Sequence, residues 1–363
     1  MNDALFPLPP GSTIGVLGGG QLGRMLAMAA ARLGFDVAVL DPERGAPAHR
    51  VAAHAIVGDY DDPEALEVLA SLADVITFEF ENVPARAIEI LEALGAEVAP
   101  AGRALAIAQD RLDEKRFLNE AGEPTVAFAE VTGPDDIVEA LETLGRPLLI
   151  KGRRGGYDGK GQAWVQQPRE AKAVFAAIGG QPAIAETPAD FRRELSVIAA
   201  RGRDGEIALY PLAENHHEAG ILRRTVAPAT VTPQTTAQAE RIAATLLSAL
   251  GYVGVIGIEL FERDDGKLLV NEFAPRVHNT GHWTLDGCEV DQFEQHIRAV
   301  AGWPLGPTNA IARVEMTNLI GDEANDWARF SAEPETRLWL YGKADVRAGR
   351  KMGHLNRLTP LRG

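Results

Sequence analysis

The 363-residue sequence has little of several features that mark large protein classes. It contains one cysteine, Cys288, which excludes an internal disulfide and points to a reducing compartment. No apolar run is long enough to cross a bilayer, and no basic segment followed by an apolar stretch opens the chain. We therefore expect a cytoplasmic protein without a signal peptide or a membrane anchor.

Positive charge is also scarce, because 36 Lys and Arg residues face 51 Asp and Glu residues, for a formal net charge of −15. This balance argues against a protein that coats nucleic acid or binds an anionic membrane surface. Any phosphate-bearing ligand must therefore be met by a local cluster of cations. The hydrophobic content of 46% is that of an ordinary globular protein, and the length predicts two or three domains.

Residues 13–100 alternate short apolar runs with amphipathic stretches, the pattern of parallel strands joined by helical crossovers. The first turn, Gly18 to Gly23, fits G-x-G-x-x-G, and Asp41 ends the next strand, where a dinucleotide fold has its ribose acid. The turn indicates a nucleotide or sugar-phosphate site, an NAD-dependent oxidoreductase, or only a close strand–helix crossing. The predicted strands are 13–17, 37–40, 55–57, 75–78 and one at Val98, and the predicted helices are 21–33, 63–72 and 84–94.

Two acidic residues, Glu79 and Glu81, follow the strand predicted at 75–78. The carboxyl end of that strand should face the glycine turn, at the edge where open α/β sheets bind ligands. These side chains are therefore expected either to meet an amine or hydroxyl of a ligand, or to cap the helix that begins near Pro84.

A long helix is predicted over residues 103–121, with a domain boundary near its start. It carries Arg111 and Lys115 four residues apart, a spacing usual for a solvated face. Downstream, short strands are predicted to end at Glu186 and to cover 194–201, and Glu186 is a candidate acceptor for an adenine amine or a ribose hydroxyl. The segment His216-His217-Glu218 is predicted to be a loop, and it lacks the spacing of a zinc site.

A glycine-rich segment follows Lys151, the last residue of another predicted strand. Four glycines between 155 and 161 are interleaved with Arg153, Arg154 and Lys160. Glycines allow backbone N–H groups to approach phosphate oxygens, and the cations neutralise the phosphate charge. The alternative is a surface hairpin that turns at Asp158-Gly159. Because cations are this dense in an acidic protein, the segment favours a phosphate site.

Two apolar runs flank Asp265-Gly266, a dipeptide that favours a two-residue hairpin turn. Counting back from that turn places Glu259 opposite Glu272, with Cβ atoms about 4.5–5.5 Å apart on one face. Two carboxylates there repel each other unless a divalent cation lies between them, and Mg²⁺ takes one or two carboxylates beside water and phosphate oxygens. Asn271 would add a neutral oxygen. The alternatives are a solvated strand face, or a three-residue turn that offsets the pair.

Polar residues are dense in two further segments. The irregular stretch after Glu272 contains Arg276, His278, Asn279 and Thr280, which predicts a site that holds a substrate phosphate or positions a nucleophile. The C-terminal stretch from Lys343 to His354 is basic, and it is either a solvated tail or a second grip on phosphate.

A phosphate loop with a carboxylate pair for Mg²⁺ is the equipment of phosphoryl transfer from ATP. At this point the sequence resembles the ATP-grasp ligases, and among them the N5-carboxyaminoimidazole ribonucleotide synthases of purine biosynthesis. The segments that carry the resemblance, which extends over nearly the whole chain, are GGGQLGRM (18–25), TFEFENV (77–83), RRGGYDGKGQ (153–162), NEFAPRVHNTGHW (271–283), YGK (341–343) and GRKMGH (349–354).

The resemblance implies an α/β fold of three parts: a Rossmann-like domain with a parallel sheet (1–102), an ATP-grasp domain of antiparallel sheets and helices (103–303), and a small C-terminal domain (304–363). It implies that bicarbonate is joined to the amine of 5-aminoimidazole ribonucleotide through carboxyphosphate, while ATP is split to ADP and phosphate. It further implies ATP and Mg²⁺ as cofactors and a homodimer, with neither nucleic acid nor a membrane as partner.

The resemblance also assigns roles to residues that match the family's motifs. The expected ATP-binding residues are Arg111, Lys151, Gly155, Gly156, Tyr157, Asp158, Gly159, Lys160, Gly161, Glu186, Glu194, His217, Asn271 and Glu272. The expected Mg²⁺ ligands are Glu259 and Glu272. The residues expected around the ribonucleotide are Gln21, Leu22, Glu79, Arg276, His278, Asn279, Thr280, Lys343, Arg350 and Lys351. The expected catalytic residues are Tyr157, Asp158, Lys160, Arg276, His278 and Asn279.

Three alternatives to this assignment remain. Formate-dependent glycinamide ribonucleotide transformylase is a related ATP-grasp enzyme, although its ATP loop has a different glycine–serine pattern. An NAD-dependent oxidoreductase and a non-catalytic nucleotide-binding sensor are the more distant alternatives.

Overall fold

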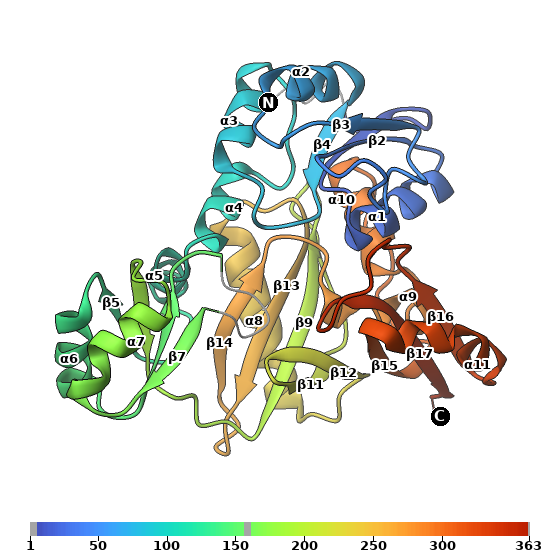
Figure 1. The fold of residues 1–363 in the computed structure, drawn as a ribbon. Coiled ribbons are helices and arrows are strands. Elements are labelled where there is room, and N and C mark those ends of the chain that lie inside the picture. Colours follow the sequence, from blue (N-terminus) through green and yellow to red (C-terminus); the bar gives the residue numbers. More distant parts are fainter. Residues whose placement is uncertain (1–5, 156–160, 362–363) are drawn as a thin grey trace.

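The structure is a computed structural model that describes residues 6–155 and 161–361. An N-terminal α/β unit (blue in Figure 1) lies above a broad central sheet, a small lobe (green) lies to one side, and C-terminal strands (red) lie on the other. Across the described ranges, no helix is both long enough and apolar enough to span a membrane.

The N-terminal unit is a four-stranded parallel sheet with the strand order β3-β2-β1-β4. Its strands are β1 (Thr13–Leu17), β2 (Asp36–Asp41), β3 (His54–Val57) and β4 (Val75–Phe78), and its helices are α1 (Gln21–Arg32), α2 (Pro63–Leu72) and α3 (Ala85–Ala93). Every residue of β4 is buried, as expected for a strand of a parallel sheet. These elements confirm the predicted pattern, except that Val98 forms only an isolated bridge with Ile76.

The prediction of one helix over residues 103–121 is wrong. The chain forms α4 (Gly102–Ala108) and α5 (Arg111–Glu120), which are separated at Asp110. Asp110 has extended backbone, and its carboxylate accepts the backbone N–H of Leu112 at 3.1 Å. This side chain caps the second helix, so a residue that has low helix propensity ends one helix and starts the next.

The small lobe is a four-stranded antiparallel sheet with the order β5-β8-β6-β7. Its elements are β5 (Phe128–Val131), α6 (Pro134–Thr143), β6 (Leu148–Gly152), β7 (Gln162–Val165), the short η1 (Pro168–Glu170), α7 (Ala171–Ala177) and β8 (Ala183–Glu186). The two α-helices contribute to the apolar core of the lobe together with the sheet. Lys151 is the second-to-last residue of β6, and Glu186 is the last residue of β8.

The central sheet has nine strands in the order β14-β13-β9-β11-β12-β15-β17-β16, and β10 pairs with β9. Its strands are β9 (Arg193–Arg201), β10 (Ile207–Leu209), β11 (Ala213–Glu218), β12 (Ile221–Ala227), β13 (Gly254–Glu262), β14 (Leu268–Ala274), β15 (Ala312–Ile320), β16 (Thr336–Leu340) and β17 (Lys351–Pro360). The accompanying helices are α8 (Pro233–Ala249), η2 (Asn279–Gly281), α9 (Thr284–Gly287), α10 (Gln292–Val300), η3 (Gly321–Asp326) and α11 (Trp327–Ala332). Because β12 pairs with β15, the C-terminal strands continue the sheet. The predicted boundaries at 102/103 and 303/304 stay predictions.

His216 and His217 lie in β11, so the prediction of a loop at this segment is wrong. A register shift between these two residues in the pairing of β11 with β12 explains why the segment shows no regular strand pattern.

The hairpin between β13 and β14 has a three-residue turn, so the predicted two-residue turn is wrong. The N–H of Arg263 donates to the carbonyl of Lys267 at 2.9 Å, and Gly266 adopts the left-handed conformation at φ +77°. Such a turn alone would offset the two glutamates. The pair survives because a β-bulge makes Asn271 an extra residue: Leu260 pairs with Val270, whereas Glu259 pairs with Glu272.

His296 of α10 joins the N-terminal sheet to the central sheet. Its Nδ1 accepts the backbone N–H of Val255 on β13 at 3.0 Å, so its Nε2 carries the proton and donates to Thr77 Oγ1 on β4 at 2.8 Å. The ring is fully buried, and this burial lowers the pKa of His296 to about 3.

We expect His296 to make the protein sensitive to acid. The unfolded residue has a pKa near 6.5 and the folded one near 3, so between these values the unfolded chain binds one more proton and stability falls as the pH falls. His296→Gln should reduce the slope of unfolding free energy against pH, between about pH 6 and 4, by about 1.4 kcal/mol per pH unit. Urea denaturation at several pH values measures this slope, with exposed His54→Gln as the control. An unchanged slope in His296→Gln would contradict a neutral, buried ring.

Candidate active site

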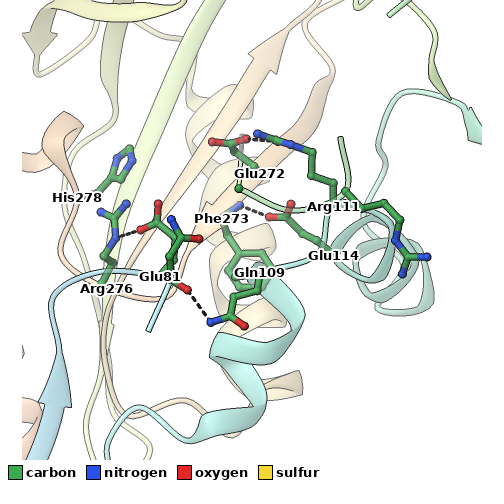
Figure 2. Close-up of a pocket in the computed structure, with 13 residues that line it drawn as sticks. Glu81, Gln109, Arg111, Glu114, Glu272, Phe273, Arg276 and His278 are labelled. Carbon is green, nitrogen blue, oxygen red and sulfur yellow. Dashed lines mark hydrogen bonds and ion pairs between the residues drawn. The ribbon is translucent and has the colours of Figure 1, made fainter. Parts of the chain in front are cut away.

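A pocket opens where the start of α5 and the end of β14 meet the N-terminal unit. Its lining residues are Glu81, Asn82, Ala108, Gln109, Arg111, Glu114, Arg153, Gly155, Glu272, Phe273, Ala274, Arg276 and His278. Figure 2 shows Arg111 directed toward Glu272 and Arg276 directed toward Glu81. Segments 77–83, 153–162 and 271–283, which the sequence singles out separately, therefore contribute to one cavity.

Glu259 and Glu272 lie opposite each other at the bulge, with Asn271 beside them. Asn271 Nδ2 lies 3.5 Å from Glu259 Oε2. Burial and the charge of Glu272 raise the pKa of Glu259 to about 7. Burial would also raise the pKa of Glu272, but Arg111 Nη1, 3.0 Å from Glu272 Oε2, holds it at about 2. The charges of the two carboxylates therefore repel each other across the strand pair, as the sequence predicts.

These donors fit a divalent cation that takes only some of its ligands from the protein. Within residues 6–155 and 161–361, no group of three or more His, Cys, Asp and Glu side chains is arranged to hold a metal ion. Two opposed carboxylates with an adjacent amide leave most coordination positions to other oxygens. This is the usual protein share of a Mg²⁺ site at a nucleotide.

Two consecutive residues of α5 hold the bulge from the open edge of β14. Glu114 Oε1 accepts the N–H of Phe273 at 2.7 Å, and Lys115 Nζ donates to the carbonyl of Asn271 at 2.7 Å. Both side chains are buried, with exposures of 3% and 2%. Burial and the charge of Glu272 raise the pKa of Glu114 to about 8. An edge strand has unpaired backbone groups, and here α5 pairs them on either side of Glu272.

The predicted solvated face at Arg111 and Lys115 is therefore wrong. Lys115 also lies 3.5 Å from Glu186 Oε1, and Lys151 Nζ lies 2.6 Å from Glu186 Oε2. Burial raises the pKa of Glu186, but the two lysines outweigh it and the pKa is lowered. The three side chains join the small lobe to α5 and β14. The predicted role of Glu186 toward adenine or ribose stays a prediction.

Asp110, the cap of α5, also holds the start of the glycine-rich segment. Its carboxylate lies 2.8 Å from Arg153 Nε and 3.3 Å from Arg154 Nε, and the N–H of Arg111 donates to the carbonyl of Arg153 at 2.9 Å. Gly155 lines the pocket, and the carbonyl of Gly161 accepts the N–H of Gly152 at 2.9 Å. The predicted site residues Gly156, Tyr157, Asp158, Gly159 and Lys160 lie outside the described residues.

Comparison with known proteins gives a consistent result over nearly the whole chain. Residues 12–109 match the ribonucleotide synthetase preATP-grasp domain, residues 116–293 match the ATP-grasp domain, and residues 315–361 match the phosphoribosylaminoimidazole carboxylase C-terminal domain. N5-carboxyaminoimidazole ribonucleotide synthase of Brucella melitensis is 52% identical over 97% of this chain and 98% of its own length. The chain belongs to the N5-carboxyaminoimidazole ribonucleotide synthase family.

Other members of the family are similar over nearly the same extent. The synthase of Pseudomonas aeruginosa is 46% identical over 94% of this chain and 93% of its own length. The Thermus thermophilus structure has a TM-score of 0.89 at 44% identity and covers 95% of this chain and 93% of that one. The Aspergillus clavatus synthase, in complex with ADP and 5-aminoimidazole ribonucleotide, has a TM-score of 0.90 at 32% identity and covers 97% and 94%.

The family's glycine turn, 18–23, is occupied by the protein's own carboxylates. Glu79 accepts the N–H groups of Gly20 at 2.6 Å and Gly23 at 2.9 Å, and Asp41 accepts the N–H of Gly19 at 2.7 Å. These are the donors that a dinucleotide phosphate would use. The alternative of an NAD-dependent oxidoreductase therefore loses its structural basis. Glu79 does cap a helix, but that helix is α1 and not the one after Pro84.

The family segment 276–280 lies against β13. Arg276 Nε pairs with Glu81, and His278 Nδ1 lies 2.8 Å from Thr280 Oγ1, while His278 Nε2 lies 3.8 Å from Glu259 Oε1. Burial and Arg276 lower the pKa of His278 to about 3. A Cβ on Gly257 would lie 2.5 Å from His278 Cβ, so only glycine allows this approach.

Glu194 and His217 form an ion pair on β9 and β11, next to the carboxylate pair. Glu194 lies two residues from Ser196, the register partner of Glu259, so its side chain shares that face of the sheet. Burial would lower the pKa of His217, but Glu194 and Glu259 raise it overall. This places two predicted ATP-binding residues beside the proposed metal site.

The predicted substrate residues lie at different places. Arg276 and His278 line the pocket, whereas Asn279, Thr280, Gln21 and Leu22 are not among its described lining residues. Lys351 lies close enough for its charge to act on both histidines: it adds to the lowering of the pKa of His278, which burial chiefly causes, and it opposes the net rise in the pKa of His217. Lys343 Nζ donates to the carbonyl of Lys351 at 2.8 Å, and Arg350 Nη1 donates to the carbonyl of Asp345 at 3.0 Å.

Sequence reasoning missed Asp110, Glu114 and Lys115 as parts of the site. Their residue types are common on helix surfaces, and their spacing is that of any solvated helix. Only the packing of α5 against the edge of β14 distinguishes them from residues of a solvated helix. That packing cannot be predicted from the local sequence.

Proposed function

We propose that the protein carboxylates 5-aminoimidazole ribonucleotide with bicarbonate at the expense of ATP, through carboxyphosphate, and releases N5-carboxyaminoimidazole ribonucleotide, ADP and phosphate. The observation that carries the proposal is the single pocket that joins Glu272 and Arg111 to Arg276 and His278. Close relatives that match over nearly their whole length carry the name of this activity.

The reaction brings two anions, bicarbonate and a triphosphate, into contact, so the site must neutralise charge and exclude water. Three cations are already oriented by carboxylates: Arg111 by Glu272, Lys151 by Glu186, and Arg276 by Glu81. Such pairing holds each cation in place before substrate binds. We assign Arg111 and Lys151 to the ATP phosphates and Arg276 to the ribonucleotide side.

We propose that Glu259 and Glu272 hold Mg²⁺ with nucleotide oxygens, and that Asn271 supports them. The ion would supply neutralisation of the phosphate charge. The protein's part is to keep both carboxylates on one face, which it does through the bulge at Asn271 and the contacts from Glu114 and Lys115.

His278 is neutral at physiological pH because of its low pKa. Its Nδ1 is taken up by Thr280, which leaves Nε2 on the side of Glu259. A neutral imidazole in this position can orient the substrate amine, whereas a pKa of about 3 makes it a poor acceptor for the proton of that amine. We assign His278 to the orienting role.

An ADP-release assay tests the function directly. Addition of 5-aminoimidazole ribonucleotide with bicarbonate should stimulate ADP release many-fold over either compound alone. No stimulation would exclude the proposal. Activity only with glycinamide ribonucleotide and formate would instead favour the transformylase.

We also propose that Arg350 contributes to ribonucleotide binding through its charge. Arg350→Ala should raise the KM for the ribonucleotide about tenfold, since a charge-assisted hydrogen bond is worth about 1.5–3 kcal/mol. Steady-state kinetics with each substrate varied in turn measures this effect. If only the KM for ATP rises, the C-terminal basic segment belongs to the other ligand.

A cytoplasmic homodimer completes the proposal. The family resemblance supports the dimer. The single, buried Cys288 supports a reducing compartment such as the cytoplasm. Sedimentation velocity at several protein concentrations tests the dimer.

A further inference from the structure

Two arginines of the N-terminal unit converge on Gly342, the residue before Lys343. Arg50 Nη1 donates to the carbonyl of Gly342 at 3.3 Å, and Arg24 Nη1 donates to the carbonyl of Pro47 at 3.1 Å. A Cβ built on Gly342 would lie 3.2 Å from Arg50 Nη1 and 4.0 Å from Arg24 Nη1. Both guanidinium groups therefore border the same point, although they come from α1 and from the segment after β2.

Neither arginine has an acidic partner in the described parts of the chain, where their printed hydrogen bonds go only to backbone carbonyls. Arg153 and Arg276, in contrast, each pair with a carboxylate. The pKa of Arg24 is lowered by burial and by the charge of Arg50, and no acid offsets these effects. Acidic residues outnumber basic ones in this protein, so an uncompensated pair of cations requires an explanation.

The C-terminal basic segment lies against the same place. Lys343 directly follows Gly342, and its Nζ donates to the carbonyl of Lys351. The charge of Lys351 acts on His278 of the pocket. We call Arg24, Arg50 and Lys343 the interdomain cation cluster, because the two arginines come from the N-terminal unit and Lys343 follows Gly342 in the connection between β16 and β17.

We propose that Arg24 and Arg50 form part of the site for the 5′-phosphate of the ribonucleotide. This inference rests on the proposed function and extends it to two residues that the family resemblance does not assign. Like charges that share one location repel each other, and a phosphate dianion removes the repulsion while guanidinium groups match its geometry. The carbonyls of Pro47 and Gly342 orient the two groups without neutralising them.

The position of Arg24 on α1 links the cluster to the substrate side of the pocket. Gln21, which the resemblance assigns to the ribonucleotide, lies three residues earlier on the same helix, so the two side chains are neighbours on its surface. A phosphate between α1 and Lys343 would thus contact both halves of the cluster and fix the C-terminal segment against the N-terminal unit.

Calorimetric binding of the ribonucleotide and of its dephosphorylated riboside separates a phosphate contact from a structural one. Arg24→Gln and Arg50→Gln should each weaken ribonucleotide binding about tenfold and riboside binding less than about twofold. Arg50→Lys, which keeps the charge, should recover part of the loss. Arg44→Gln removes an exposed arginine of the same unit and serves as the matched control.

Equal weakening of both ligands would overturn the inference, because the arginines would then act only by holding the two domains together. Unchanged ribonucleotide binding in both variants would also overturn it. These outcomes are distinct from failure of the proposed function, which would appear in the unaltered protein as an absence of ribonucleotide-stimulated ADP release.

Discussion

Glu272→Gln is expected to lower turnover by at least about 100-fold while the protein stays folded. The substitution removes one charge from the opposed carboxylates at nearly constant volume, so the site loses its attraction for a divalent cation. It also removes the carboxylate charge that, together with burial as the larger cause, raises the pKa of Glu259. ADP release at increasing Mg²⁺ concentrations measures the loss, and circular dichroism with thermal unfolding establishes the fold.

The matched control for this experiment is Glu218→Gln at the end of β11, where the side chain is 76% exposed and belongs to the same sheet. This control should retain the rate of the unaltered protein. Normal rates in Glu272→Gln at ordinary Mg²⁺ concentrations would show that the opposed pair does not hold a metal ion needed for the reaction.

Lys115→Met is expected to cost about 3–5 kcal/mol of unfolding free energy, the usual cost of breaking a buried charge pair by removing one partner. Methionine keeps the length of the side chain but cannot donate to the carbonyl of Asn271 or neutralise Glu186. The bulge would then lack its contact beside Glu272, so we also expect a raised KM for ATP. Urea denaturation and ATP kinetics measure the two effects.

Lys267→Met in the hairpin turn is the control, because its side chain is 73% exposed. If Lys115→Met loses no more unfolding free energy than this control, Lys115 belongs to a solvated helix face, as its sequence spacing suggests. In Lys115→Met the buried Glu186 carboxylate keeps less compensating positive charge. Adding Glu186→Gln removes that carboxylate, so the double variant should regain part of the lost stability.

The carboxylate pair shows how far local reasoning reaches in this protein. Counting back from a two-residue turn at Asp265-Gly266 places Glu259 opposite Glu272, and the structure confirms that alignment. The turn nevertheless has three residues, and a bulge at Asn271 compensates for it. Contacts from α5, which lies far away in the sequence, stabilise this bulge. The alternation of polar and apolar residues along the strand therefore does not reveal it.

The helix over residues 103–121 shows the reverse case. Its helical character was predictable from composition, but the interruption at Asp110 depends on one carboxylate that both caps α5 and pairs with Arg153. Glu79 behaves similarly, because its role as a cap of α1 requires the neighbouring strands β1 and β4 to bring it to Gly20 and Gly23.

Residue type and short spacing are enough to predict the type and order of most elements, the glycine-rich turns, the two opposed acids and the segments typical of the family. Packing between distant segments sets which charges are buried and what they contact: Lys115 against β14, Glu79 at the start of α1, and Arg24 with Arg50 beside Gly342. The reason is physical. Whether a charged side chain is solvated, paired or directed at a ligand depends on surfaces that meet only after distant segments pack together, and local sequence carries no signal of that meeting.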